Sequence, residues 1–241
     1  MTALQWHKYL EQAERRDHKT VFTVTELANI ANVAPHSLNV QLGRLVGRGV
    51  IVRYASGRYG LPGRVSPEDL VGFLDSGAYI TGLSALYHHN LVAQRPTTIT
   101  CFTNRRHNRS RIRKTPIGTF TFVCVSGRIY HRPADRSIAP AEQAFCDWLY
   151  LCSRKNVAPE SQVTFGPLAG LREEVLVDLL TRYPGTVARE AARILATGGA
   201  PSWVKNLSGK LKLDPTGRPR ARPRKQPSEA EKAPSGNNKQ F

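Results

Sequence analysis

Residues 23–61 read TVTELANIANVAPHSLNVQLGRLVGRGVIVRYASGRYGL, and this stretch decides the fold. Thr23 and Glu26 have the spacing of a capping box, and an apolar run follows them directly. This pattern predicts a short helix that starts near Thr25. Proline is tolerated in the first turn of a helix, so we expect a second helix to begin around Pro35. This helix should end at the glycines 47 and 49.

A hairpin is predicted directly after these two helices. Two short β-rich runs flank Ala55-Ser56-Gly57, which is typical of a glycine-containing turn. Upstream, residues 2–16 form a further, moderately amphipathic helix candidate. Helix, short helix, tight turn, helix and hairpin is the element order of a winged helix-turn-helix, so we expect residues 1–62 to form such a domain.

The second predicted helix carries the candidate base-reading residues. Its apolar face holds Leu38, Leu42 and Leu45. At about 100° per residue, the candidate DNA-binding residues that point outward are His36, Ser37, Val40 and Arg44, with Asn39 on the flank. A guanidinium can pair with guanine, an amide with adenine, a hydroxyl with base or phosphate, and an apolar group can contact a thymine methyl.

Arg53 and Arg58 stand on either side of the hairpin turn, where a wing would contact a neighbouring groove or phosphate. Two other interpretations of residues 1–62 stay open at this point. In the first, the outer face of the second helix contacts only solvent. In the second, the winged fold binds another protein and not DNA.

The net charge of the chain indicates which class of partner it binds. The formal net charge is +17. The surplus is concentrated in residues 93–136, with 10 basic and 1 acidic residues, and in residues 205–241, with 10 and 3. A surplus of this sign favours phosphate-bearing partners, and nucleic acid comes before an anionic membrane surface.

The segment from Asn104 to Lys114 holds most of the basic residues in the middle of the chain. Arg109, Arg111 and Arg113 alternate, so in an extended chain they point to one side and can follow a phosphate track. A solvated loop is the competing interpretation. The candidate DNA contacts in this segment are Arg105, Arg106, Arg109, Arg111, Arg113 and Lys114.

The rest of the chain predicts a second, α+β domain over residues 63–212. A helical pattern over residues 64–94 is followed by two alternating runs, TTITCFT and TFTFVCV, which predict an antiparallel pair joined by the arginine-rich loop. Helices return at residues 140–153, 171–183 and 186–196. Residues 213–241 are rich in Pro, Arg and Lys and poor in apolar residues, which predicts a disordered basic tail.

No motif of an enzyme, cofactor site or metal site stands out. The sequence has no G-x-S-x-G, P-loop or H-E-x-x-H pattern, and its four cysteines form no CxxC pair. His88 and His89 lie next to each other, so on a helix they point to different faces, and we expect a packing role. Asp147 is a candidate buried carboxylate without a partner. We therefore predict that the protein is not an enzyme and needs no cofactor.

The N-terminus lacks the apolar core of a signal peptide, and no run of about 18 apolar residues occurs. We expect a soluble, cytoplasmic protein without a membrane partner, whose cysteines are small buried thiols.

Two stretches in the middle of the chain read YITGLSALYHHNLVAQRPTTITCFT and APAEQAFCDWLYL. In these stretches the chain resembles the AbiEi family of bacterial antitoxins and transcriptional regulators. The matching positions are Ser84, Ala85, Leu86, Tyr87, His88, Leu91, Gln94 and Pro96, then Glu142, Ala144, Asp147, Leu149 and Tyr150.

The resemblance implies a repressor that binds operator repeats in double-stranded DNA and counteracts a nucleotidyltransferase-like toxin. The basic, Pro-rich tail departs from the family pattern. Two alternatives stay open: a plain transcription factor or mobile-element DNA-binding protein without a toxin, and a protein that coats nucleic acid without sequence preference.

Overall fold

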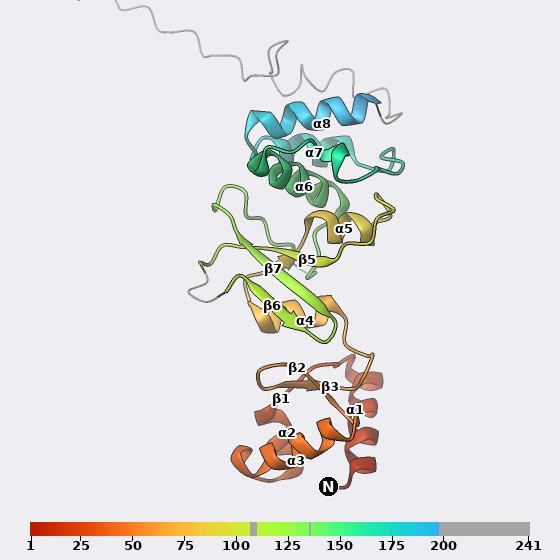
Figure 1. The fold of residues 1–241 in the computed structure, drawn as a ribbon, viewed down its shortest axis with the longest axis vertical. Helices are drawn as coiled ribbons and strands as arrows, with labels where there is room; N and C mark the ends of the chain where they lie inside the picture. The colour runs from red at the N-terminus through yellow and green to blue at the C-terminus, as the bar shows by residue number, and fades with distance from the viewer. Residues whose placement is uncertain (107–109, 135, 198–241) are drawn as a thin grey trace, which may run out of the picture.

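The computed structural model describes residues 1–106, 110–134 and 136–197. Within these residues the chain has eight α-helices and two small sheets, stacked along one long axis (Figure 1). This arrangement confirms the predicted α+β class. The predicted tail over residues 213–241, and the end of the predicted second domain, lie outside the described residues.

The N-terminal part follows the predicted order of helices and hairpin. Its elements are α1 (Ala3–Asp17), β1 (Phe22–Thr23), α2 (Val24–Ala31), α3 (Pro35–Gly47), β2 (Val52–Ala55) and β3 (Arg58–Gly60). The predicted capping box is present, because the Thr23 side chain accepts the Glu26 N–H at 3.1 Å and the Glu26 carboxylate accepts the Thr23 N–H at 2.8 Å. Asn32 adopts a left-handed φ of 52° and ends α2, so only a short turn separates α2 from α3.

The sheet of the N-terminal part has a strand that the sequence pattern did not predict. The strand order is β1-β3-β2, with both pairs antiparallel. The two residues of β1 are too few to show a strand period, but they place β3 at the centre of the sheet instead of at its edge. A hydrophobic cluster fills the space between the helices and this sheet; its buried members are Trp6, Leu10, Phe22, Leu27, Ala28, Leu38, Leu42, Leu45, Ile51, Tyr59 and Leu61.

The remaining elements build the larger part of the molecule. They are α4 (Pro67–Leu74), β4 (Tyr79–Ile80), α5 (Gly82–His88), β5 (Thr98–Thr103), β6 (Ile112–Thr115), β7 (Gly118–Cys124), α6 (Ala141–Lys155), the 3-10 helix η1 (Pro159–Ser161), α7 (Glu173–Leu180) and α8 (Gly185–Thr197). Figure 1 shows the sheet in the middle of the molecule, with α6, α7 and α8 stacked beyond it. Most of α6 is buried, since it lies between α5 on one side and α7 and α8 on the other.

The predicted antiparallel pairing of the two alternating runs is wrong. Strands β5 and β7 are parallel neighbours, and the strand order is β4-β5-β7-β6. Parallel neighbours need a long connection, and here residues 104–117 provide it. This connection is not only a loop, because residues 112–115 form β6, which pairs antiparallel with β7 through a tight hairpin. The chain therefore reverses twice between β5 and β7, which restores its direction.

The two parts of the molecule share buried contacts. Val21 and Tyr54 from the N-terminal part belong to the same hydrophobic cluster as Leu70 and Val71 of α4. The Tyr54 hydroxyl also donates to the backbone oxygen of Leu61 at 2.8 Å. The face of the β1-β3-β2 sheet that carries Tyr54 thus packs against the larger part, which fixes the hairpin to α4.

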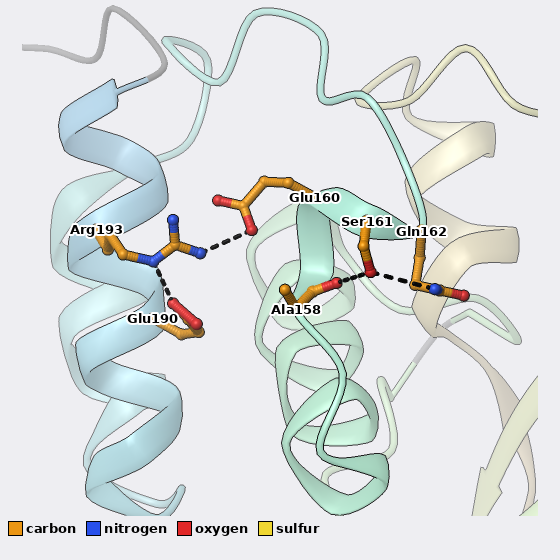
Figure 2. Close-up of polar contacts among 6 residues, drawn as sticks. All are labelled: Ala158, Glu160, Ser161, Gln162, Glu190 and Arg193. Atoms are coloured by element: carbon orange, nitrogen blue, oxygen red, sulfur yellow. Dashed lines mark hydrogen bonds and ion pairs between the residues drawn. The ribbon is translucent and has the colours of Figure 1, made fainter.

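Helix α8 is joined to η1 by a small ionic clamp (Figure 2). The Arg193 guanidinium contacts the Glu160 carboxylate at 2.7 Å and the Glu190 carboxylate at 2.6 Å. These side chains are partly exposed, so the clamp orients α8 and adds little to stability. Separately, none of the helices within the described residues is both long and apolar enough to cross a membrane.

Candidate nucleic-acid interface

Helix α3 is held by one apolar face and leaves the opposite face open. Leu38, Leu42 and Leu45 are buried in the N-terminal cluster, as the spacing predicted. Pro35 occupies the first turn, where its missing N–H has no helical partner to lose. The short turn after Asn32 sets the direction of α3 relative to α2.

The predicted base-reading residues all lie on the open face of α3. His36, Ser37, Asn39, Val40 and Arg44 are exposed. Val40 is an apolar residue with 61% of its surface exposed, although ordinary packing favours its burial. Within the described residues, none of these five side chains takes part in a hydrogen bond or ion pair of the structure. Their polar atoms are therefore available to a ligand.

Two glycines, which sequence reasoning did not select as site residues, complete this face. Gly43 and Gly47 lie one turn apart on α3, and a Cβ built at either position would meet no atom within 4 Å. A glycine inside a helix costs about 0.5–1 kcal/mol relative to alanine. Packing among the described residues does not require either glycine. Because these two glycines have no side chain, a partner can approach the helix backbone closely.

Arg53 and Arg58 occupy different environments, although both flank the hairpin turn. Arg53 is exposed on β2. Arg58 is half-buried on the central strand β3, where its guanidinium lies 5.3 Å from the centre of the Phe73 ring of α4 and donates to the Gly57 backbone oxygen at 3.2 Å. This cation–π contact fixes Arg58 to the larger part of the molecule. The two arginines thus differ in their surroundings, and their DNA contacts stay predictions.

The arginine-rich segment begins directly after β5 and ends within β6. Arg105, Arg106, Arg111 and Lys114 are exposed, whereas Arg109 lies outside the described residues. Arg113 is half-buried, and its guanidinium turns back to donate to the backbone oxygens of Ser110 and Ile112. The phosphate track of Arg109, Arg111 and Arg113 stays a prediction.

Asp147, the candidate functional carboxylate of the sequence, is fully buried in α6. It accepts hydrogen bonds from the hydroxyls of Thr81 at 2.6 Å, Tyr183 at 2.5 Å and Tyr79 at 3.3 Å. Burial raises the pKa of Asp147 to about 7, although these hydrogen bonds act in the opposite direction. With 0% of its surface exposed, this carboxylate of α6 joins β4, the N-cap of α5 and the connection between α7 and α8, and it cannot contact a substrate.

The other motif residues also make internal contacts. Burial alone would raise the pKa of Glu142, but the hydrogen bonds and charge of Arg172, whose Nε lies 2.9 Å from the carboxylate, lower it. His89 contacts the Ala139 backbone oxygen at 2.8 Å, and His88 lies 3.7 Å from Glu68. In the described part of the chain, no group of three or more His, Cys, Asp or Glu residues is placed to hold a metal ion.

The four cysteines are free thiols in the structure. Cys101, Cys146 and Cys152 are buried, as expected, whereas Cys124 at the end of β7 is partly exposed. Burial raises the pKa of the Cys152 thiol to about 11 and raises those of Cys101 and Cys146 as well. Only Cys124 is therefore accessible to reagents in the folded protein.

Comparisons with known proteins give a fold and no family. No protein-family model matches the chain, and no curated protein matches it. The structure is similar to the crystal structure of the RV2827C protein from Mycobacterium tuberculosis, with a TM-score of 0.52 and 18% sequence identity, covering 86% of this chain and 81% of that chain. At this identity the similarity concerns the fold alone. The AbiEi resemblance stays a prediction.

Proposed function

We propose that this protein is a sequence-specific regulator that binds double-stranded DNA, with residues 1–62 forming a winged helix-turn-helix and α3 lying in the major groove. The observation that carries the proposal is the open face of α3. This face combines exposed polar side chains, an exposed valine and two glycines on a helix whose other face is fully packed. Groove-reading helices have this division between a buried and a base-contacting face.

Each exposed side chain of α3 matches a feature of the major groove. Arg44 carries the forked donor that pairs with guanine, and Asn39 carries the amide that pairs with adenine. Val40, at the centre of the face, is suited to a thymine methyl. His36 and Ser37 lie in the first turn, where they can contact bases or the adjacent phosphate.

The hairpin has two roles in this proposal. Arg53 is exposed and can contact a phosphate beside the groove. Arg58 instead holds the hairpin to Phe73 of α4, so it contributes rigidity and not a direct contact. Tyr54 is also buried in the cluster that includes Leu70 and Val71 of α4, so this cluster supports the same anchoring of the hairpin.

The test of the proposal is a selection of binding sites from a library of random duplexes with the full-length protein. We expect an enriched sequence, which the protein then binds more tightly than a scrambled duplex in fluorescence anisotropy. Val40→Glu places a carboxylate at the centre of the α3 face and should abolish this preference. Leu4→Glu, at another exposed apolar position on α1 (63% exposed), is the matched control and should retain it.

Failure of the selection is informative. If no sequence is enriched and Val40→Glu binds all duplexes as the unmodified protein does, the sequence-specific proposal is wrong. Coating of nucleic acid without sequence preference is then the better interpretation.

We extend the proposal to the antitoxin role that the AbiEi resemblance implies. The support for this narrower role is the resemblance alone, because its motif residues make internal contacts here. Ser84, for example, donates to the Thr98 backbone oxygen and accepts the Thr100 N–H, and Asp147 is buried. The test is to express the downstream gene alone and together with this chain. A downstream gene that is harmless alone removes the antitoxin role and leaves the DNA-binding regulator.

A further inference from the structure

A hollow opens at the carboxyl ends of the two parallel strands. Thr103 ends β5 and Cys124 ends β7, and these two residues are paired in the sheet register. In open α/β sheets, ligands bind outside the carboxyl ends of the strands, and the hollow has the corresponding place here. The hollow has a volume of about 720 Å³.

The lining of the hollow is mostly polar. It consists of Asn104, Arg106, Arg111, Phe122, Cys124, Val125 and Ser126. Two guanidinium groups, one amide and one hydroxyl give a set of hydrogen-bond donors on an apolar floor formed by the buried Phe122 and Val125. No carboxylate is among these described lining residues, so the donor set is suited to an anion.

The positive charges at the hollow lack an internal counter-ion among the described residues. Arg106 and Arg111 are exposed and take part in no ion pair of the structure. Asp75 contacts the end of β5, but it is buried and accepts hydrogen bonds from the Thr103 hydroxyl at 2.7 Å and the Gly77 N–H at 2.8 Å. This carboxylate is not among the residues that line the hollow.

We propose that this hollow, through Arg106, Arg111, Asn104 and Ser126, is a phosphate-binding site. Guanidinium groups bind phosphate oxygens through paired, charge-assisted hydrogen bonds, and hydroxyl and amide donors fix the orientation. The phosphate belongs either to the DNA backbone or to a free nucleotide. The first source rests on the proposed function, because it would be a second contact to the duplex that α3 reads; the second does not.

Cys124 provides a direct probe of occupancy. Its thiol lines the hollow, and the other three cysteines are buried. The experiment measures the alkylation rate of Cys124 in the full chain with neutral iodoacetamide, which the arginines do not attract. It is repeated with inorganic phosphate, with a nucleoside monophosphate and with duplex DNA. A bound phosphate should slow alkylation several-fold.

Two double variants make the test specific. Arg106→Gln with Arg111→Gln removes both guanidinium groups of the hollow and should abolish protection. Lys8→Gln with Arg95→Gln removes two exposed charges elsewhere and should retain it. In DNA binding, the hollow variant should also reduce the salt slope by about 1–2, since each lost phosphate contact contributes close to one.

The outcomes separate the possible sources. Protection by phosphate, by the monophosphate and by DNA, lost in the hollow variant, supports a general phosphate site. Protection by DNA alone, lost in the same variant, supports a backbone contact. Equal alkylation rates with and without every ligand overturn the inference, even if α3 still selects a DNA sequence. Protection by the monophosphate without any sequence selection would overturn the proposed function and support this site.

Discussion

The open face of α3 and the surroundings of Asp147 use similar polar groups in opposite ways. On α3, Asn39 and Arg44 are exposed, and within the described residues their side chains make no hydrogen bond of the structure. Around Asp147, three hydroxyls and one carboxylate are buried and bonded to one another. Buried polar groups must be satisfied inside the protein, whereas exposed ones are free for a partner. The first region is thus suited to recognition, and the second specifies the fold.

The largest effect should come from removing the buried carboxylate. Asp147→Ala leaves the hydroxyls of Tyr79, Thr81 and Tyr183 without their acceptor, which should lower the free energy of unfolding by roughly 3 kcal/mol. Urea denaturation measures this change. Asp178→Ala, which removes an exposed carboxylate (69% exposed side chain), is the control and should change stability little. If the two variants are equally stable, the buried hydrogen bonds of Asp147 do not specify the fold, and the contrast with the exposed face of α3 is wrong.

A pH dependence should follow from the raised pKa of Asp147. The folded state binds this proton more tightly than the unfolded state. The stabilisation is therefore complete below the unfolded pKa near 4 and is lost as pH rises through about 7. Relative to Asp147→Asn, the protein should lose about 1.4 kcal/mol per pH unit within this window. Denaturation of both proteins between pH 4 and pH 8 measures the difference, and a constant difference would contradict it.

On α3, the largest effect should appear in binding and not in stability. Arg44→Ala should weaken binding to a selected duplex by about 1–3 kcal/mol and barely change binding to random duplex. Lys8→Ala on α1 removes the same charge from another face and should affect both duplexes equally and weakly. Anisotropy titrations give the four affinities. An equal loss on both duplexes for Arg44→Ala would show that this residue does not read bases.

The smallest effect should come from replacing a glycine of α3. We expect this change to increase the free energy of unfolding but to weaken DNA binding. Gly43→Ala should stabilise the protein by about 0.5–1 kcal/mol, because alanine favours the helix and its Cβ meets no atom. The same change should weaken DNA binding. Gly72→Ala in α4, where a Cβ also meets no atom, should stabilise the protein without affecting DNA. If both variants bind DNA normally, close approach to α3 is not required.

Local signals made the α2–α3 region predictable from the sequence. The capping box at Thr23, the proline at position 35 and the glycines around the end of α3 each act within a few residues, and the helix bounds follow from them. The open face of α3 then follows from helical periodicity. The environment of Arg58 could not be predicted in this way, because it depends on the two-residue strand β1 and on Phe73 from another element.

Long-range partners explain what the sequence could not predict in the larger part. Asp147 was recognisable as a carboxylate, but Tyr79, Thr81 and Tyr183 lie 36–68 residues away along the chain. The pairing of β5 with β7 was predicted in the wrong direction because β6 lies within a highly charged segment. Ile112 to Thr115 shows too weak an apolar alternation to be distinguished from a loop.

The chain reverses its direction twice between β5 and β7, and this also affects the order in which the sheet folds. The β6–β7 hairpin closes through neighbouring residues, whereas each β5–β7 pair joins residues 21 positions apart, such as Thr98 and Thr119. The entropy of closing this loop must be lost before the parallel contacts form. We expect the hairpin to form first and to serve as the template for β5. The length of the arginine-bearing connection would then influence the rate at which the sheet assembles.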